Sequence, residues 1–103
     1  MFQLFVYVPE SHLEEVKAAM FAAGAGRSQR YEQCSWQVLG QGQFLPLEGS
    51  EPYIGQVKEV ARIPEYRLEM ICGEVELPQV ISAMKQAHPY EEPAYGAFLL
   101  LRV

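Results

Sequence analysis

Apolar residues fill both faces of the first segment, residues 2–8. In an extended chain Phe5 and Tyr7 fall on one face, and the other face carries Phe2, Leu4, Val6 and Val8. β-Branched and aromatic residues favour strands, and two apolar faces are typical of a strand inside a sheet. The pattern predicts a central strand that ends at Pro9.

A helical spacing follows the strand. Apolar side chains recur at i, i+3, i+7 and i+10 from Leu13, which predicts an amphipathic helix over residues 11–24. Ser11 and Glu14 have the spacing of a capping box at its start. The glycines at 24–26 are its expected end.

Alternation returns in residues 31–39 and predicts a strand with one face made of Cys34, Trp36 and Val38. Two glycines in residues 40–42 indicate a turn, and residues 49–52 indicate a surface loop. Residues 56–72 predict either one long strand or two strands broken at Pro64.

The last third of the chain repeats the strand and helix pattern. Pro78 in a first-turn position predicts a helix over 77–87, which ends at His88 and Pro89. The apolar run 97–103 predicts the final strand. The predicted order is β-α-β-β-α-β.

An internal repeat supports this order. A shift of 64 residues places Leu4 on Leu68, Leu13 on Leu77, Val16 on Val80, Ala19 on Ala83, Met20 on Met84 and Ala23 on Ala87. Two strand–helix units with right-handed crossovers predict one α+β, ferredoxin-like domain over residues 1–103. Its four-stranded antiparallel sheet would carry both helices on one face and an extended β-hairpin of the strands near 31–39 and 56–72.

The second face of that sheet would be uncovered. Phe5, Tyr7 and alternate residues of the last strand point there, an apolar surface larger than soluble monomers usually expose. We therefore expect a homo-oligomer, with Trp36 at the subunit interface.

Charge and composition narrow the partners. Eight Lys and Arg against thirteen acids give a net charge of −5, which leaves no basic stripe for nucleic acid. The absence of a long apolar run and of a signal sequence predicts no membrane partner and a cytoplasmic location. Cys34 and Cys72 form no C-x-x-C motif and are expected to be reduced.

Every acidic residue is a glutamate, because the chain contains no Asp, and it also lacks Asn and Thr. This composition excludes an Asp-based triad and an EF-hand loop, and only two histidines, His12 and His88, are present. We expect a protein that is not an enzyme.

The distinctive motif is HPYEEPAY, residues 88–95. Its prolines stiffen the joint between helix and strand, so one interpretation is purely structural. In the other, the segment binds a ligand through His88, Tyr90, Glu91, Glu92 and Tyr95. Imidazole, carboxylate and thiolate groups also suggest a divalent metal ion held by Cys34, His88 and Glu91, and a His–Glu acid–base pair is a third possibility.

Four blocks resemble a known family. HPYEEPAY, VYVPESHLEEVKAAMFAAGAG, YEQCSWQVLGQGQFLP and GSEPYIGQV are similar to the domain inserted in bacterial Nif-three-like proteins, and HPYE also resembles CutA-like proteins. The resemblance covers nearly the whole chain and implies the trimer-forming, PII/CutA-like version of the ferredoxin-like fold. In that family the paired metal ions lie in a flanking domain. This chain departs from the family at Gly96, where an acid is common.

The leading hypothesis is a non-enzymatic oligomer, with a trimer expected, that binds a small ligand, a metal ion or a partner protein in the clefts between subunits. The alternative is a metal-dependent hydrolase accessory or weak enzyme related to Nif-three-like proteins. A purely structural assembly module is the third possibility.

Overall fold

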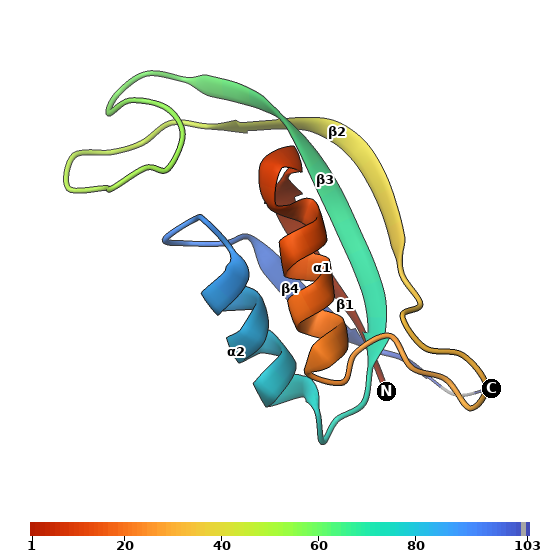
Figure 1. Cartoon of the computed structure of the whole chain (residues 1–103). Coiled ribbons are helices and arrows are strands. Elements are labelled where there is room, and N and C mark those ends of the chain that lie inside the picture. Colours follow the sequence, from red (N-terminus) through yellow and green to blue (C-terminus); the bar gives the residue numbers. More distant parts are fainter. Residues whose placement is uncertain (102) are drawn as a thin grey trace.

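The computed structural model describes residues 1–101 and 103, and in this part of the chain one four-stranded antiparallel sheet is covered on a single face by two α-helices (Figure 1). The strand order is β2-β3-β1-β4. In chain order the elements are β1 (Phe2–Pro9), the 3-10 helix η1 (Glu10–His12), α1 (Leu13–Ala22), β2 (Trp36–Phe44), β3 (Ala61–Cys72), α2 (Leu77–Ala87) and β4 (Tyr95–Leu99). The predicted α+β, ferredoxin-like fold is confirmed.

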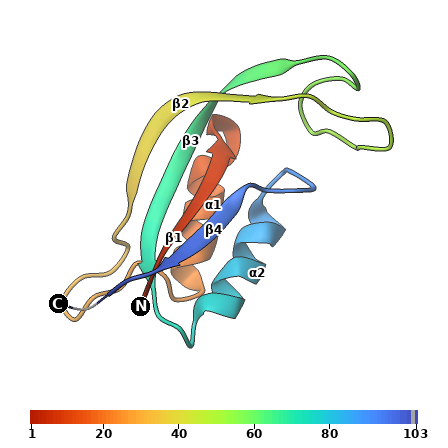
Figure 2. The ribbon, with the colours of Figure 1, turned by 180° about the vertical axis from the view of Figure 1, so that it is seen from behind.

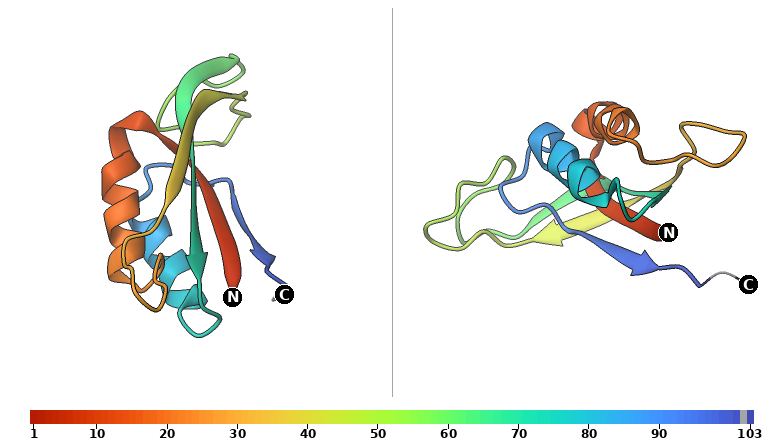
Figure 3. Two further views of the ribbon diagram at one scale, coloured as in Figure 1. Left: turned by 90° about the vertical axis from the view of Figure 1, so that its right-hand side faces the viewer. Right: turned by 90° about the horizontal axis from the view of Figure 1, so that it is seen from below.

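The core lies between the sheet and the helices, as the views along the sheet in Figure 3 show. Alternate residues of the two central strands meet the apolar faces of both helices there, and most of them are below 3% exposed. This core consists of Leu4, Val6, Val8, Leu13, Val16, Met20, Ala25, Leu68, Met70, Cys72, Val80 and Met84. Removal of this apolar surface from water is the main stabilising contribution to the fold.

Strand pairing explains why β1 and β3 are the buried strands. β1 pairs antiparallel with β3 over its whole length, from Phe2 opposite Cys72 to Pro9 opposite Glu65, and with β4 on its other side. The central position of β1 agrees with its two apolar faces. The predicted helix over 77–87 also agrees with α2, whose Pro78 lies in the first turn, where a missing N–H costs nothing.

The hairpin differs from the sequence expectation. The predicted turn at residues 40–42 is wrong, because β2 continues straight through it to Phe44, with Gly40 opposite Glu65. Pro64 does not break β3. The pairing of β3 with β1 ends at Glu65, so residues 61–64 of β3 pair with β2 alone. A residue without an N–H is tolerated there, because one side of the strand has no partner in the described chain. The long hairpin therefore projects past the helices and ends in the loop 45–60 (Figure 2).

The other boundaries also shift. Residues 31–35 lie outside β2, whose strand begins at Trp36. Residues 10–12 form the 3-10 turn η1, so the predicted helix over 11–24 is shortened to Leu13–Ala22. The final strand begins at Tyr95 and ends at Leu99, and of the predicted run 97–103, Arg102 lies outside the described residues.

Candidate ligand site and open sheet face

His88 follows the last turn of α2 and is 7% exposed. Its Nδ1 accepts a hydrogen bond from the backbone N–H of Tyr90 at 3.1 Å, and its Nε2 lies 2.8 Å from the carbonyl oxygen of Tyr7. A nitrogen that accepts an N–H carries no proton, so Nε2 is the protonated nitrogen and donates to Tyr7. Both ring nitrogens are thus engaged within the chain.

The surroundings of His88 favour its neutral form. Burial lowers the pKa of this imidazole most strongly, the hydrogen bond to the Tyr7 carbonyl opposes that shift, and the charge of His12 adds to it. Protonation would also force Nδ1 to stop accepting the Tyr90 N–H. His88 is accordingly a fixed neutral joint between α2, β1 and the loop that follows.

Tyr90 connects the same loop to the hairpin. Its hydroxyl donates to Oε2 of Glu65 on β3 at 3.0 Å. Its ring centroid lies 4.9 Å from that of His88 and 6.2 Å from that of Phe44, at the end of β2. Burial, followed by the hydrogen bond to Glu65 and its negative charge, raises the pKa of the Tyr90 phenol. The phenol therefore stays protonated and acts as a donor.

A second contact joins the two loops. Oε1 of Glu91 accepts the backbone N–H of Glu51 at 2.8 Å, and Tyr53 meets the ring of His12 edge-on at 5.4 Å between centroids. Residues 43–54 and the loop after α2 thus line a cavity of about 600 Å³ that is open to solvent on one side. Figure 1 shows the two segments that supply most of its lining, the green hairpin loop and the blue loop before β4.

Only some of the predicted ligand residues line this cavity. Tyr90, Glu91 and Glu92 line the cavity. His88 lies behind it, and Tyr95 points to the helix side, where it packs against the core and its ring centroid lies 5.2 Å from Nζ of Lys85. The cavity residues that sequence reasoning missed include Phe44, Glu48, Glu51, Tyr53 and Glu65. Of these residues only Glu51 lies in the loop expected at 49–52, and the periodicity of the sequence marked none of the others as a ligand residue.

The suggested metal ligands do not meet within one chain. The backbone N–H of Cys34 donates to Gly26, which in turn donates to Ile71 near the end of β3. His88 and Glu91 lie at the Glu65 end of that strand, about six residues or ~20 Å away. Over residues 1–101 and 103, no three His, Cys, Asp or Glu side chains are grouped closely enough to hold a metal ion.

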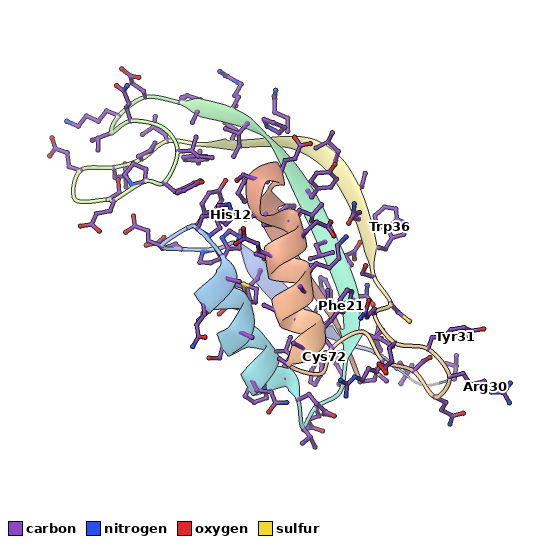
Figure 4. The ribbon with its side chains drawn as sticks, in the orientation of Figure 1. His12, Phe21, Arg30, Tyr31, Trp36 and Cys72 are labelled. Carbon is purple, nitrogen blue, oxygen red and sulfur yellow. The ribbon has the colours of Figure 1, made fainter. Side chains whose placement is uncertain are left out.

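The sheet face opposite the helices carries a second candidate surface, which we call the open face. It consists of the outward-facing residues Gln3, Phe5, Tyr7, Trp36, Val38, Arg67, Glu69 and Phe98. Phe98 is 56% exposed and Trp36 is 59% exposed. In Figure 4 Trp36 projects from β2 away from both helices, which agrees with the register of the strand.

Arg67 lies at the centre of the open face. Its guanidinium carbon is 4.3 Å from the ring centroid of Phe5, Nη1 donates to the Tyr7 hydroxyl, and Nε lies 3.6 Å from Glu69. Phe5 in turn stacks on Phe98, with ring centroids 5.5 Å apart. These contacts join the Phe5, Tyr7 and Phe98 rings and Arg67 into one cluster on the open face.

Gly96 provides space for the Phe5 ring. A Cβ atom at this position would lie 2.7 Å from Cζ of Phe5, which is closer than carbon atoms approach without a shift. Gly96 is therefore directly beneath an aromatic ring of the open face.

Comparison with known proteins identifies the relatives of this chain. No protein-family model matches it. It is 47% identical over 96 residues to a GTP cyclohydrolase 1 type 2 homolog of Mycobacterium tuberculosis and 43% identical over 96 residues to one of Bacillus subtilis, covering 93% of this chain in each case. The chain spans about a quarter of the length of these relatives, 25% and 26%.

A solved Bacillus cereus protein related to NIF3 superimposes with a TM-score of 0.83 at 38% identity, over 96% of this chain and 25% of that one. This chain is homologous to a segment of NIF3-related proteins. The CutA protein of Archaeoglobus fulgidus shares the fold of this chain, with a TM-score of 0.71 at 15% identity over 100% of this chain and 87% of that one. Both parts of the predicted resemblance, to Nif-three-like proteins and to the CutA-like fold, are confirmed. None of the helices formed by residues 1–101 and 103 has the length and apolar character needed to cross a membrane.

Proposed function

We propose that this chain is a non-enzymatic domain that assembles into a trimer through its open face and binds a small ligand beside the hairpin. The observation that carries the proposal is the open face itself, on which Phe98 and Trp36 remain more than half exposed. Burial of such side chains against a second copy contributes about 25 cal/mol per Å² of apolar area. The free energy gained favours association.

The edges of the sheet support the same arrangement. β2 and β4 are the outer strands of the described chain, and β2 is exposed along most of its length. Unpaired strand edges are places where another strand adds by main-chain hydrogen bonds. The edges of β2 and β4 are thus available for pairing with strands of other copies.

The non-enzymatic part of the proposal rests on His88. Its two ring nitrogens are already committed to Tyr7 and Tyr90, so it is not poised to exchange a proton with a substrate. Cys34 and Cys72 are both free thiols in the described chain, which fits the proposed cytoplasmic location.

Phe98→Glu tests the assembly. The side chain is exposed in the single chain, so the variant should fold, while a carboxylate in a buried apolar interface is costly. Light scattering coupled to size exclusion should give three times the chain mass for the parent protein and one chain mass for the variant. Val75→Glu is the matched control, because Val75 is 88% exposed and lies in the turn before α2. A monomeric parent protein at micromolar concentration would overturn the proposal.

A further inference from the structure

The charged residues that line the cavity beside the hairpin are all acidic. Five glutamates line it, at positions 48, 51, 65, 91 and 92, and no lysine or arginine is among its described lining residues. Lys58 neutralises Glu48 at 3.0 Å, and the described residues form no other ion pair with this set. The potential inside is therefore negative, and it disfavours phosphate and carboxylate ligands.

Aromatic residues form another part of the lining. Tyr7, Phe44, Tyr53 and Tyr90 all contribute to the cavity wall. The faces of such rings attract cations, and the contact also buries the apolar stem that carries the charge. Rings and carboxylates together are complementary to a positively charged organic molecule.

The spacing of the carboxylates argues against a metal ion. A divalent cation needs several oxygen ligands at 2.0–2.6 Å from one point. The acidic groups here do not converge in that way within the described chain, and two of them already accept hydrogen bonds, Glu65 from the Tyr90 hydroxyl and Glu91 from the Glu51 N–H. A ligand with charges at its ends and an apolar middle fits the wider spacing.

We propose that the cavity between residues 43–54 and the loop after α2 binds an organic cation, an alkyl amine with an apolar stem. This inference rests on the ligand-binding part of the proposed function and names its ligand class. Glu51 and Glu92 supply attraction from the rim, and the rings of Tyr90 and Phe44 contact the stem.

Three six-carbon probes with cationic, neutral and anionic end groups test this assignment. Hexane-1,6-diamine, hexane-1,6-diol and adipate are added to the parent protein, and amide shifts are followed by nuclear magnetic resonance. The amides of Glu51 and Tyr90 report on the cavity because both are hydrogen-bonded at its wall. We expect the diamine alone to shift these signals, with an affinity that falls as salt is raised.

A pair of double variants separates local charge from net charge. Glu51→Gln with Glu92→Gln removes two charges at the rim, and we expect the affinity for the diamine to fall about four-fold or more, as for weak exposed ion pairs. Glu15→Gln with Glu74→Gln changes the net charge equally at two exposed residues outside the cavity and should leave the affinity unchanged. Equal affinities in the two double variants would overturn the proposal.

The probes also separate this inference from the proposed function. If the diol or adipate shifts the Glu51 and Tyr90 amides and the diamine does not, the cavity is a ligand site and the cationic class is wrong. If the trimer forms and none of these probes shifts either amide, the inference is wrong and the ligand-binding part of the proposed function loses its site.

Discussion

Single residues in the HPYEEPAY segment show how one motif separates into different roles. His88 is buried and holds three parts of the chain together through its two ring nitrogens, Tyr95 packs against the core, and Glu91 closes the cavity by accepting a backbone N–H. The sequence motif marked all of these residues equally. Which of them faces the cavity depends on the direction of each side chain after the loop has folded.

His88 predicts a particular dependence of stability on pH. Its pKa in the folded state lies below the ordinary value of 6.5, so near that pH the unfolded state binds more protons. The free energy of unfolding should therefore be highest above pH 6.5 and decrease as the pH falls through 6.5 toward the folded-state pKa. Urea unfolding at pH 7.5, 6.5 and 5.5 measures this change.

Two histidine variants assign the effect. His12→Gln should keep the decrease in stability between pH 7.5 and 5.5, whereas His88→Gln should lower stability at pH 7.5 and remove most of the pH dependence in this range. A parent protein whose stability is constant or increases on acidification to pH 5.5 would show that His88 is not held neutral by the fold.

At the scale of elements, the start of α1 differs from its sequence signal. Ser11 and Glu14 have capping-box spacing, yet the chain forms the 3-10 helix η1 before α1. Among the described residues, no side chain makes a capping hydrogen bond at the start of η1 or of α1. The Ser11 hydroxyl instead lies 2.8 Å from Nδ1 of His12. The 3-10 turn rotates the Ser11 side chain away from the backbone N–H groups whose hydrogen bonds its oxygen would accept in a capping box.

Ser11→Ala therefore should have little effect on stability. A true serine cap contributes about 1 kcal/mol, and we expect a change in the free energy of unfolding below about 0.5 kcal/mol for this exposed residue. Gly26→Ala serves as a sensitive control, because Gly26 has φ +74° and an added Cβ would lie 2.7 Å from the carbonyl oxygen of Cys34. If urea unfolding shows that Ser11→Ala lowers the free energy of unfolding by about 1 kcal/mol or more, Ser11 acts as a helix cap after all.

At the scale of the whole molecule, the proposed trimer predicts that stability and assembly are coupled. A core on one side of the sheet stabilises the single chain, while in the proposed trimer the open face is buried against other copies. Association that involves only the folded state adds to stability by mass action. One face of the sheet is thus covered by the helices of the same chain, and the other face is covered only in the proposed trimer.

The melting temperature should consequently rise with protein concentration. For a trimer, each ten-fold increase stabilises the folded chain by on the order of 1 kcal/mol, which corresponds to several degrees for a domain of this size. Differential scanning fluorimetry over 1–100 μM measures the rise. Phe98→Glu should melt at a lower temperature that does not depend on concentration, and a concentration-independent parent protein would contradict the coupling.

The sequence by itself determined the order of elements, the central position of β1, the extent of α2 and the existence of an open apolar face. These follow from short-range periodicity, which records which side of each element avoids water, as the two apolar faces of residues 2–8 and the 64-residue repeat illustrate. Only the tertiary structure decided that β2 runs through Gly40, that the ring nitrogens of His88 are occupied, and that Glu51, Glu65 and Glu91 meet around one cavity. The strand pairing and the long-range hydrogen bonds behind those features join residues 25 to 81 positions apart. Such contacts depend on strand register and loop closure, for which local pattern carries no signal.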